Sequence, residues 1–282
     1  MKLQRLRHEL RSILREAQSA RPEYSADLII SLRAGISRAE LIYKDDEIPA
    51  HVCRGIFSAA AKRAKGVPLA YVLHEAEFYG YPFKVGRGVL IPRPESELLV
   101  EEALKYFPKG RAARFADWCT GSGCIACALL LENPSLSCVA VDKSPHALRW
   151  ARMNAKRLKL EARVEFLLNG EPRLAPVEEE SLDFITANPP YIPSEEIAGL
   201  MPEVRDYEPH AALDGGRGGT FLYKKFFAAF PRFLKSGGMI LCECAGGRQA
   251  EELCELSGGS FVLVNKVLDY NAIIRHIIWR KR

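Results

Sequence analysis

Residues 188–191, Asn-Pro-Pro-Tyr, form a rigid corner after the strand-like run 182–187. Proline fixes its own φ angle and lacks an N–H donor, so the chain cannot continue here as a central strand. The side-chain oxygen of Asn188 and the carbonyl oxygen of Pro189 can then point the same way, which suits the two hydrogens of a planar –NH2 group. Tyr191 offers a flat aromatic face to such a group. The corner predicts a clamp for an amide or amine, with a proline-stiffened loop as the alternative.

A glycine loop lies earlier in the chain, between the strand-like run 114–118 and the helix-like run 124–133. Gly121 and Gly123 permit a tight turn, in which backbone N–H groups can approach a ligand at the start of the helix. Ala126 stands where the dinucleotide-binding fingerprint has its third glycine. The loop taken alone is therefore explained equally well as a simple turn.

Asp142 ends the next strand-like run, "CVAVD". An acid at this position can accept hydrogen bonds from both hydroxyls of an adenosine ribose. The alternative is a helix N-cap, a role for which Ser144 competes. Asp117, at the end of the first strand, adds a carboxylate where a cationic sulfonium could lie nearby. The loop and Asp142 together predict an adenosine-containing cofactor and leave NAD and S-adenosylmethionine both open.

The third strand-like run ends in "LLNGEP". Glu171 could contact the amino group of adenine, and Pro172 could pack against its ring. Gly-Glu-Pro is also a common turn sequence, so these two positions carry little weight by themselves.

The elements that must position these residues alternate between strand and helix from residue 114 onward. Strands are expected at 114–118, 136–144, 163–168, 182–187 and 239–245, and helices at 124–133, 145–160, 221–238 and 248–258. This alternation predicts a doubly wound parallel sheet, whose ligands bind beyond the carboxyl ends of its strands. The last residues, 261–282, read as two further strands that would add an antiparallel edge.

The first 73 residues predict a small helical bundle. Leu3, Leu6, Leu10, Ile13 and Leu14 recur at helical spacing and mark one apolar face. Ser25 and Ser37 are candidate helix caps. The stretch 74–92 changes to aromatic and β-branched residues with glycines, which predicts a β-hairpin linker. Residues 93–282 would then form the ligand-binding domain.

The amino-acid composition excludes several classes of protein. The 282 residues are 48% hydrophobic and 27% charged, the net charge is +5, and no apolar run reaches the ~18–20 residues of a membrane helix. The basic excess is too small for a dedicated reader of nucleic acid. The eight cysteines sit mostly in apolar runs, and Cys124-Ile-Ala-Cys127 has no second pair to complete a zinc site. We therefore expect a soluble cytoplasmic protein with no membrane contact and no metal.

Asn-Pro-Pro-Tyr is shared by enzymes that methylate planar amino groups. Six stretches of the sequence together indicate one family among these enzymes. They are "PLAYVLHEAEFYGYPFKVGRGVLIPRPESELLVEEAL", "DWCTGSGCIACALL", "AVDKSPHAL", "ANPPYIP", "EVRDYEPHAALDGGRGG" and "DYNAIIRH". Over almost its full length the chain resembles the HemK/PrmC family of protein-glutamine methyltransferases. The resemblance implies an α/β, Rossmann-like methyltransferase domain that uses S-adenosylmethionine. It also implies methyl transfer to the glutamine amide of a Gly-Gly-Gln loop in class 1 peptide chain release factors.

The resemblance also assigns residues. The catalytic positions are Asn188, Pro189, Pro190 and Tyr191. The cofactor-binding positions are Asp117, Cys119, Thr120, Gly121, Ser122, Gly123, Asp142, Glu171, Pro172 and Asn188. Arg93 and Glu97, in "RPESE", are weaker candidates for the substrate cleft, since capping and ion pairing explain them as well. The N-terminal helices would contact the body of the release factor.

The sequence departs from the family pattern at two positions. Cys119 stands where the family usually has glycine, so the first turn of the loop must accommodate a β-carbon. Pro172 replaces a larger apolar residue, which implies thinner packing against adenine. His210, in "YEPH", has no visible partner and is given no role.

Two other functions remain open at this stage. A methyltransferase acting on adenine in DNA or RNA would use the same corner on a flipped base, but would also need a basic groove. An adaptor that binds release factor or ribosome and keeps a vestigial fold is the non-enzymatic alternative. The presence of both Asn188 and Asp142 favours an enzyme.

Overall fold

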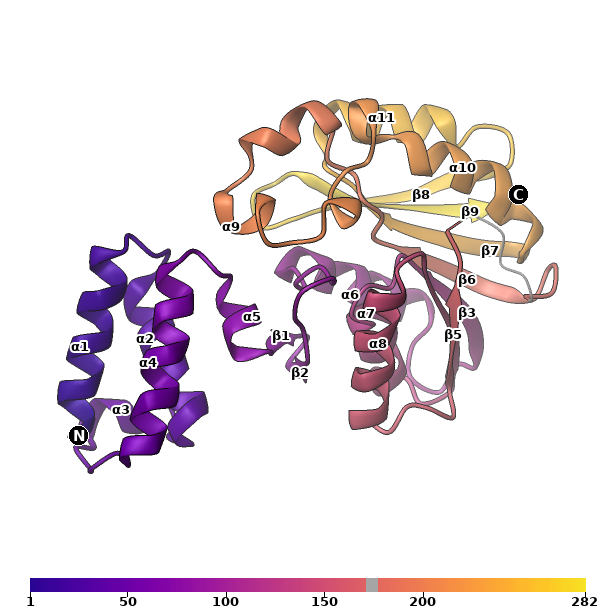
Figure 1. The fold of residues 1–282 in the computed structure, drawn as a ribbon. Coiled ribbons are helices and arrows are strands. Elements are labelled where there is room, and N and C mark those ends of the chain that lie inside the picture. Colours follow the sequence, from indigo (N-terminus) through magenta and orange to yellow (C-terminus); the bar gives the residue numbers. More distant parts are fainter. Residues whose placement is uncertain (171–176) are drawn as a thin grey trace. The chain divides into compact units, whose positions relative to one another are not determined.

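The computed structural model describes residues 1–170 and 177–282. The chain divides into two compact units (Figure 1). The N-terminal unit comprises residues 1–75 together with residues 201–207, and the C-terminal unit comprises residues 76–200 and 208–282.

The N-terminal unit is helical. Its helices are α1 (Leu3–Glu16), α2 (Pro22–Ala34), α3 (Glu40–Tyr43), α4 (Ala50–Ala64) and α5 (Leu69–Leu73). Leu3, Leu6, Leu10 and Leu14 of α1 are fully buried in the core of this unit. The predicted inclusion of Ile13 in that face is wrong, because this side chain is 36% exposed.

Of the two predicted helix caps, Ser37 is confirmed and Ser25 is wrong. Ser37 and Glu40 exchange hydrogen bonds between side chain and backbone, which is the reciprocal pattern of a capping box. Ser25 is not a cap. Helix α2 already begins at Pro22, a residue suited to a first helical turn, and Ser25 lies buried within it, donating to the carbonyl of Ala20.

Residues 201–207, with the short helix α9 (Pro202–Arg205), return to the N-terminal unit although they are remote from it in sequence. Nη1 of Arg63 lies 2.5 Å from Oε2 of Glu203, and the hydroxyl of Tyr207 donates to the carbonyl of Lys65 over 2.7 Å. Arg63 is almost completely buried, so its charge depends on this partner. The segment is therefore held by an ion pair and a hydrogen bond, and no sequence pattern indicated it.

The C-terminal unit contains a seven-stranded sheet. Its strands are β3 (Ala113–Trp118), β4 (Leu136–Asp142), β5 (Val164–Leu168), β6 (Leu182–Ala187), β7 (Leu234–Glu243), β8 (Phe261–Leu268) and β9 (Ile274–Lys281). They follow the order β5-β4-β3-β6-β7-β9-β8, and the pairs from β5 to β7 are parallel. Strand β9 pairs antiparallel with both β7 and β8, so β9 runs opposite to the other six of these strands. The predicted doubly wound sheet with an antiparallel C-terminal pair is confirmed.

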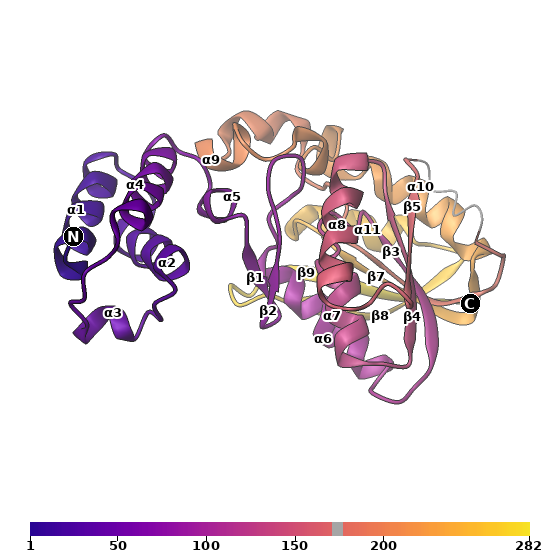
Figure 2. The ribbon, with the colours of Figure 1, turned by 60° about the horizontal axis from the view of Figure 1, so that its bottom comes forward.

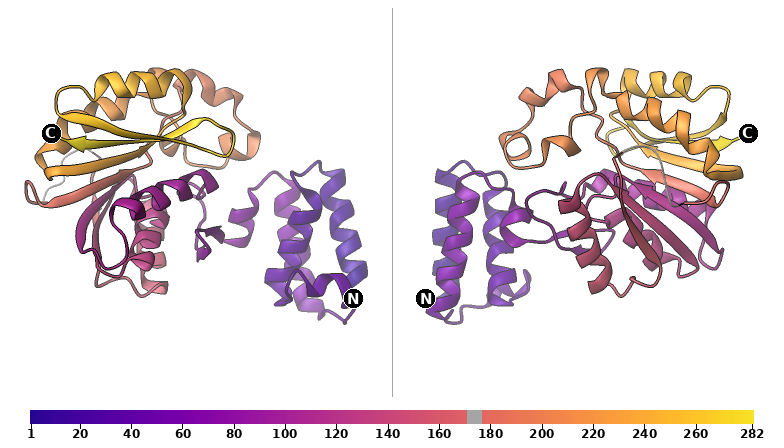
Figure 3. Two further views of the ribbon diagram at one scale, coloured as in Figure 1. Left: turned by 180° about the vertical axis from the view of Figure 1, so that it is seen from behind. Right: turned by 45° about the vertical axis from the view of Figure 1, so that its right-hand side comes forward.

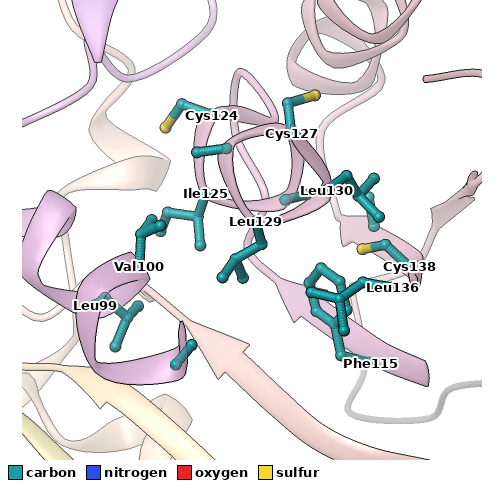
Figure 4. Close-up of a cluster of buried hydrophobic side chains, with 14 of the residues drawn as sticks. Leu99, Val100, Phe115, Cys124, Ile125, Cys127, Leu129, Leu130, Leu136 and Cys138 are labelled. Atoms are coloured by element: carbon teal, nitrogen blue, oxygen red, sulfur yellow. The ribbon is translucent and has the colours of Figure 1, made fainter. Parts of the chain in front are cut away.

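Helices cover both faces of this sheet. One face carries α6 (Glu97–Tyr106), α7 (Cys124–Glu132) and α8 (Pro145–Arg157), and the other carries α10 (Phe221–Ala229) and α11 (Gly247–Leu256) (Figures 1 and 3). Neighbouring strand residues point to opposite faces, so Phe115 packs with the first set and Ala116 with the second. Figure 4 shows Leu129 of α7 in the first cluster, together with the buried thiols of Cys127 and Cys138.

The predicted helix over 221–238 is wrong beyond Ala229. Helix α10 ends there, a single 3-10 turn spans Phe230–Arg232, and β7 begins at Leu234. Pro231 cannot donate a helical hydrogen bond, which explains the break.

A short hairpin, β1 (Ala76–Phe78) and β2 (Tyr81–Phe83), opens the C-terminal unit (Figure 2). Residues 84–93 follow it without strand structure. None of the described helices has the length and apolarity to span a bilayer.

Candidate active site

A pocket lies at the carboxyl ends of the parallel strands, within the C-terminal unit. The loops after β3, β4, β5 and β6 all contribute to its wall, as does the stretch that leads from the hairpin to α6. It encloses about 970 Å³ when its open mouth is included. Sheets of this type bind ligands at this edge, where the strand order reverses.

The loop between β3 and α7 forms one wall. Cys119, Thr120, Gly121 and Ser122 line the pocket, and the N–H of Gly123 closes the turn onto the carbonyl of Thr120 over 2.8 Å. Cys119 has a φ angle of +61°, a conformation that costs a residue with a β-carbon energy and that glycine adopts freely. The departure from the family pattern thus falls on a position where the backbone favours glycine.

Asp142 lines the same pocket and holds the glycine loop. Its Oδ2 accepts the N–H of Gly121 over 2.9 Å, and its Oδ1 accepts the N–H of Ser144 over 2.8 Å. Burial raises the pKa of this carboxyl, against the lowering effect of the two N–H groups. The cap of α8 is Ser144, whose hydroxyl accepts the N–H of Ala147. Asp142 therefore joins the ends of β3 and β4 and does not cap α8.

Asp117 lies behind the pocket and is not among its lining residues. It is fully buried, and its carboxylate accepts hydrogen bonds from the hydroxyls of Thr120 and Thr186 over 2.6 and 2.7 Å. Burial raises the pKa of Asp117 to about 6, despite the two hydroxyl donors. In this structure its contacts connect the glycine loop to β6.

The Asn-Pro-Pro-Tyr corner forms another part of the wall, directly after β6. Asn188 and Pro190 line the pocket, while Pro189 and Tyr191 are not among the lining residues. Nδ2 of Asn188 donates to the hydroxyl oxygen of Ser96 over 2.9 Å. The hydroxyl of Tyr191 donates to Oε1 of Glu243 over 3.1 Å. The corner is thus bound through two of its side chains to residues from other parts of the chain.

The loop that contains Gly215 and Gly219 packs against the backbone of this corner. A β-carbon on Gly219, whose φ angle is +71°, would lie 2.1 Å from the carbonyl oxygen of Tyr191 and 2.4 Å from Nε2 of Gln249. That carbonyl already accepts a hydrogen bond from Gln249 over 2.9 Å. Glycine is required here because the two backbone segments approach so closely.

Arg93 lines the pocket, and Glu97 is not among the lining residues. Glu208, whose side chain is buried, accepts from Arg93 over 2.6 Å and from the N–H of Ile91 over 3.1 Å. It thereby connects the stretch before α6 to the segment that follows Glu208, in which Pro209, Ala211 and Ala212 also contribute to the lining. Glu97 accepts the N–H of Tyr79 over 2.8 Å and so binds the hairpin turn.

The structure thus brings together most, but not all, of the predicted residues. Glu171 and Pro172 lie outside the described residues. Ser96, Glu208 and Glu243 were missed by sequence reasoning. Ser96 and Glu208 lie within "GVLIPRPESE" and "RDYEPHAAL", two stretches that carry the family resemblance, so the resemblance could have indicated them. Glu243 had none, since it lies inside an apolar strand between two cysteines. Among the described residues, no three His, Cys, Asp or Glu side chains gather as a metal site would require.

Comparisons with known proteins assign the chain to a family. The family described as PrmC N-terminal domain matches residues 5–73, and the family described as Methyltransferase small domain matches residues 94–201. The release factor glutamine methyltransferase of Thermodesulfovibrio yellowstonii is 37% identical over 87% of this chain and 88% of its own length. That of Geobacter sulfurreducens is 38% identical over 94% of this chain and 92% of its own.

A solved structure is also similar. The release factor-specific protein-(glutamine-N5) methyltransferase of Alicyclobacillus acidocaldarius is 28% identical, with a TM-score of 0.42, covering 71% of this chain and 99% of that one. On the identity and coverage of the two sequence relatives, this chain belongs to the release factor glutamine methyltransferase family.

Proposed function

We propose that this protein transfers a methyl group from S-adenosylmethionine to the side-chain amide nitrogen of the glutamine in the Gly-Gly-Gln motif of class 1 peptide chain release factors. One observation supports this proposal above the others. Asn188 and Pro190 line the same pocket as the glycine loop and Asp142. The residues proposed as an amide clamp and those proposed to bind the nucleoside thus line a single pocket.

The pocket fits the cofactor. Its wall combines apolar side chains such as Val89 and Ala147 with a few polar groups, which is the usual composition of a small-molecule site. Asp142 would hold the ribose hydroxyls, and the loop of Cys119 to Gly123 would hold the polar methionine portion near the start of α7. When bound, the cofactor supplies an electrophilic methyl group.

The residues of the corner would orient the attacking amide. An amide nitrogen is a poor nucleophile because resonance delocalises its lone pair. Oδ1 of Asn188 and the carbonyl oxygen of Pro189 would accept its two hydrogens and turn the lone pair toward the methyl group. Such positioning contributes up to ~7–11 kcal/mol in favourable cases. The two acceptors also stabilise the positive charge that develops on nitrogen, and the proton leaves late or after transfer.

In this proposal the protein acts in the cytoplasm, and its partner is another protein. The N-terminal unit would recognise the body of the release factor, with no direct reading of nucleic acid and no membrane contact. The match of residues 5–73 to the PrmC N-terminal domain and the release factor substrates named for the relatives support this assignment.

The Asn188→Ala variant tests the proposal. It should lose methyl transfer to release factor while still binding S-adenosylmethionine, because the glycine loop and Asp142 remain unchanged although Asn188 also lines the pocket. Asp142→Ala is the matched control, because it should weaken cofactor binding and leave the corner intact. Transfer of labelled methyl to DNA or RNA in place of release factor would favour the adenine methyltransferase instead. Undiminished activity of Asn188→Ala would exclude the mechanism.

A further inference from the structure

A buried chain of hydrogen bonds lies behind the Asn-Pro-Pro-Tyr corner. Ser96, at the end of a 3-10 turn (Pro94–Ser96), and Glu243, at the end of β7, are 2% and 1% exposed. The hydroxyl of Ser96 donates to Oε2 of Glu243 over 2.5 Å and accepts from Nδ2 of Asn188 over 2.9 Å. The hydroxyl of Tyr191 donates to the other oxygen, Oε1. The Glu243 carboxylate therefore accepts a hydrogen bond directly from Tyr191 and is linked to Asn188 through the hydroxyl of Ser96.

The chemistry of these groups fixes which atom donates and which atom accepts in each of these hydrogen bonds. A carboxylate accepts at both oxygens, and a serine hydroxyl has only one hydrogen to donate. The hydrogen of Ser96 is used by Glu243, so its oxygen can only accept from Asn188. Asn188 must then turn its NH2 group toward Ser96, and its carbonyl oxygen Oδ1 becomes the end that remains for a ligand.

The orientation matters because the two ends of an asparagine amide have opposite hydrogen-bonding character. Rotated by 180° about its last bond, Asn188 would present two N–H donors to the NH2 group of a substrate, which also carries donors. It would at the same time place its own carbonyl against the oxygen of Ser96, whose hydrogen points away. Both contacts would be unfavourable, and a buried polar group left unsatisfied costs about 1–3 kcal/mol.

We propose that Ser96 and Glu243 are positioning residues that hold the amide of Asn188 with its oxygen toward the substrate's amino group. The inference rests on the proposed function and adds two residues that act on the reaction through Asn188. His276, also fully buried, places Nε2 3.5 Å from Oε2 of Glu243 and is the third group that faces this carboxylate.

The test compares steady-state methylation of a purified release factor by the full-length wild type, Ser96→Ala, Ser96→Thr and Glu243→Gln. Ser96→Ala removes the acceptor for Nδ2 and should lower kcat by about 10- to 100-fold, as misplacement of a reacting group does. Ser96 also contributes to the pocket wall, but the Kd for S-adenosylmethionine should stay within about twofold of wild type, because the glycine loop and Asp142 are untouched. Ser96→Thr keeps the hydroxyl and should recover most of the activity.

Glu243→Gln should also lower kcat, because glutamine offers one acceptor where the carboxylate offers two to Ser96 and Tyr191. Melting temperatures of all variants report whether each one folds. A kcat for Ser96→Ala within about twofold of wild type would overturn the inference. A loss that Ser96→Thr fails to recover, although that variant folds and binds the cofactor, would overturn it as well.

A second comparison separates positioning from packing. Asn188→Asp has two equivalent oxygens, so its orientation no longer needs to be selected. In that background Ser96→Ala should change kcat by less than about twofold, whereas a role in packing alone would give the same loss in both backgrounds. A wild type that does not methylate release factor would count against the proposed function. An active wild type with unaffected serine variants would count against this inference alone.

Discussion

Replacing Gly219 by alanine tests how closely the loop that contains Gly215 and Gly219 holds the Asn-Pro-Pro-Tyr corner. The adjacent Gly218 provides a matched control, because the φ angles of the two residues are +71° and +66°. Both substitutions therefore incur the same cost of placing a β-carbon in the left-handed region, about 1–2 kcal/mol. They differ in surroundings: a β-carbon on Gly218 meets no atom within 4 Å, whereas one on Gly219 would overlap the carbonyl oxygen of Tyr191 at 2.1 Å.

The difference between the two variants isolates this overlap. We expect Gly219→Ala to be less stable than Gly218→Ala by about 1–3 kcal/mol, the usual cost of forcing extra atoms into a packed site. In a thermal melt this corresponds to roughly 2–4 °C for each kcal/mol. Activity should diverge more, because the displaced atom belongs to Tyr191 itself. A shift of about 1 Å in a catalytic group lowers kcat by up to about 100-fold.

The assay is methyl transfer to release factor at saturating cofactor, together with a thermal melt of each variant. Gly218→Ala should keep kcat within about twofold of wild type, since its β-carbon faces open space. Equal melting temperatures and equal kcat values for the two variants would show that this loop does not hold the corner in place.

Three further predictions concern charged groups. The pKa of Asp117 is raised from 3.8 to about 6, so the folded state binds its proton more tightly than the unfolded chain. Stability should therefore fall by about 3 kcal/mol as pH rises from about 4 to about 6, and urea unfolding of Asp117→Asn should lack this slope. Glu208→Gln loses the ion pair with Arg93 and should weaken cofactor binding about tenfold by calorimetry, whereas His210→Ala, at an exposed position, should not. Glu203→Gln leaves the buried charge of Arg63 without its counter-ion and should destabilise the N-terminal unit by about 1–3 kcal/mol in a thermal melt, with the exposed pair of Arg5 and Glu9 as the control.

The sheet and the loops that follow its strands could be predicted from the sequence. Alternating apolar runs such as "RFADW" and "CVAVD" have the composition of buried strands, and parallel strands bring their carboxyl ends to one edge. That geometry places Gly121, Asp142 and Asn188 around one pocket without any knowledge of side-chain contacts. The predicted helix over 221–238 runs through Pro231, whereas helix α10 ends at Ala229, two residues before this proline.

The remaining parts depend on contacts between residues far apart in sequence. Glu243 reads as one acid within an apolar strand, and only the fold brings Ser96 to it across 147 positions. The packing of residues 201–207 into the N-terminal unit likewise depends on Arg63, which local periodicity treats as an ordinary helix charge. Asp117 was expected near the sulfonium, but its two threonine contacts follow from the pairing of β3 with β6 and from the turn after β3.

The most direct test of the central proposal is mass spectrometry of a purified class 1 release factor after incubation with this protein and S-adenosylmethionine. We expect one added methyl group on the peptide that contains Gly-Gly-Gln, located on the glutamine side chain and absent when Asn188→Ala replaces the wild type. A release factor that stays unmodified with folded, cofactor-bound protein, or a methyl group found at another residue, would contradict it.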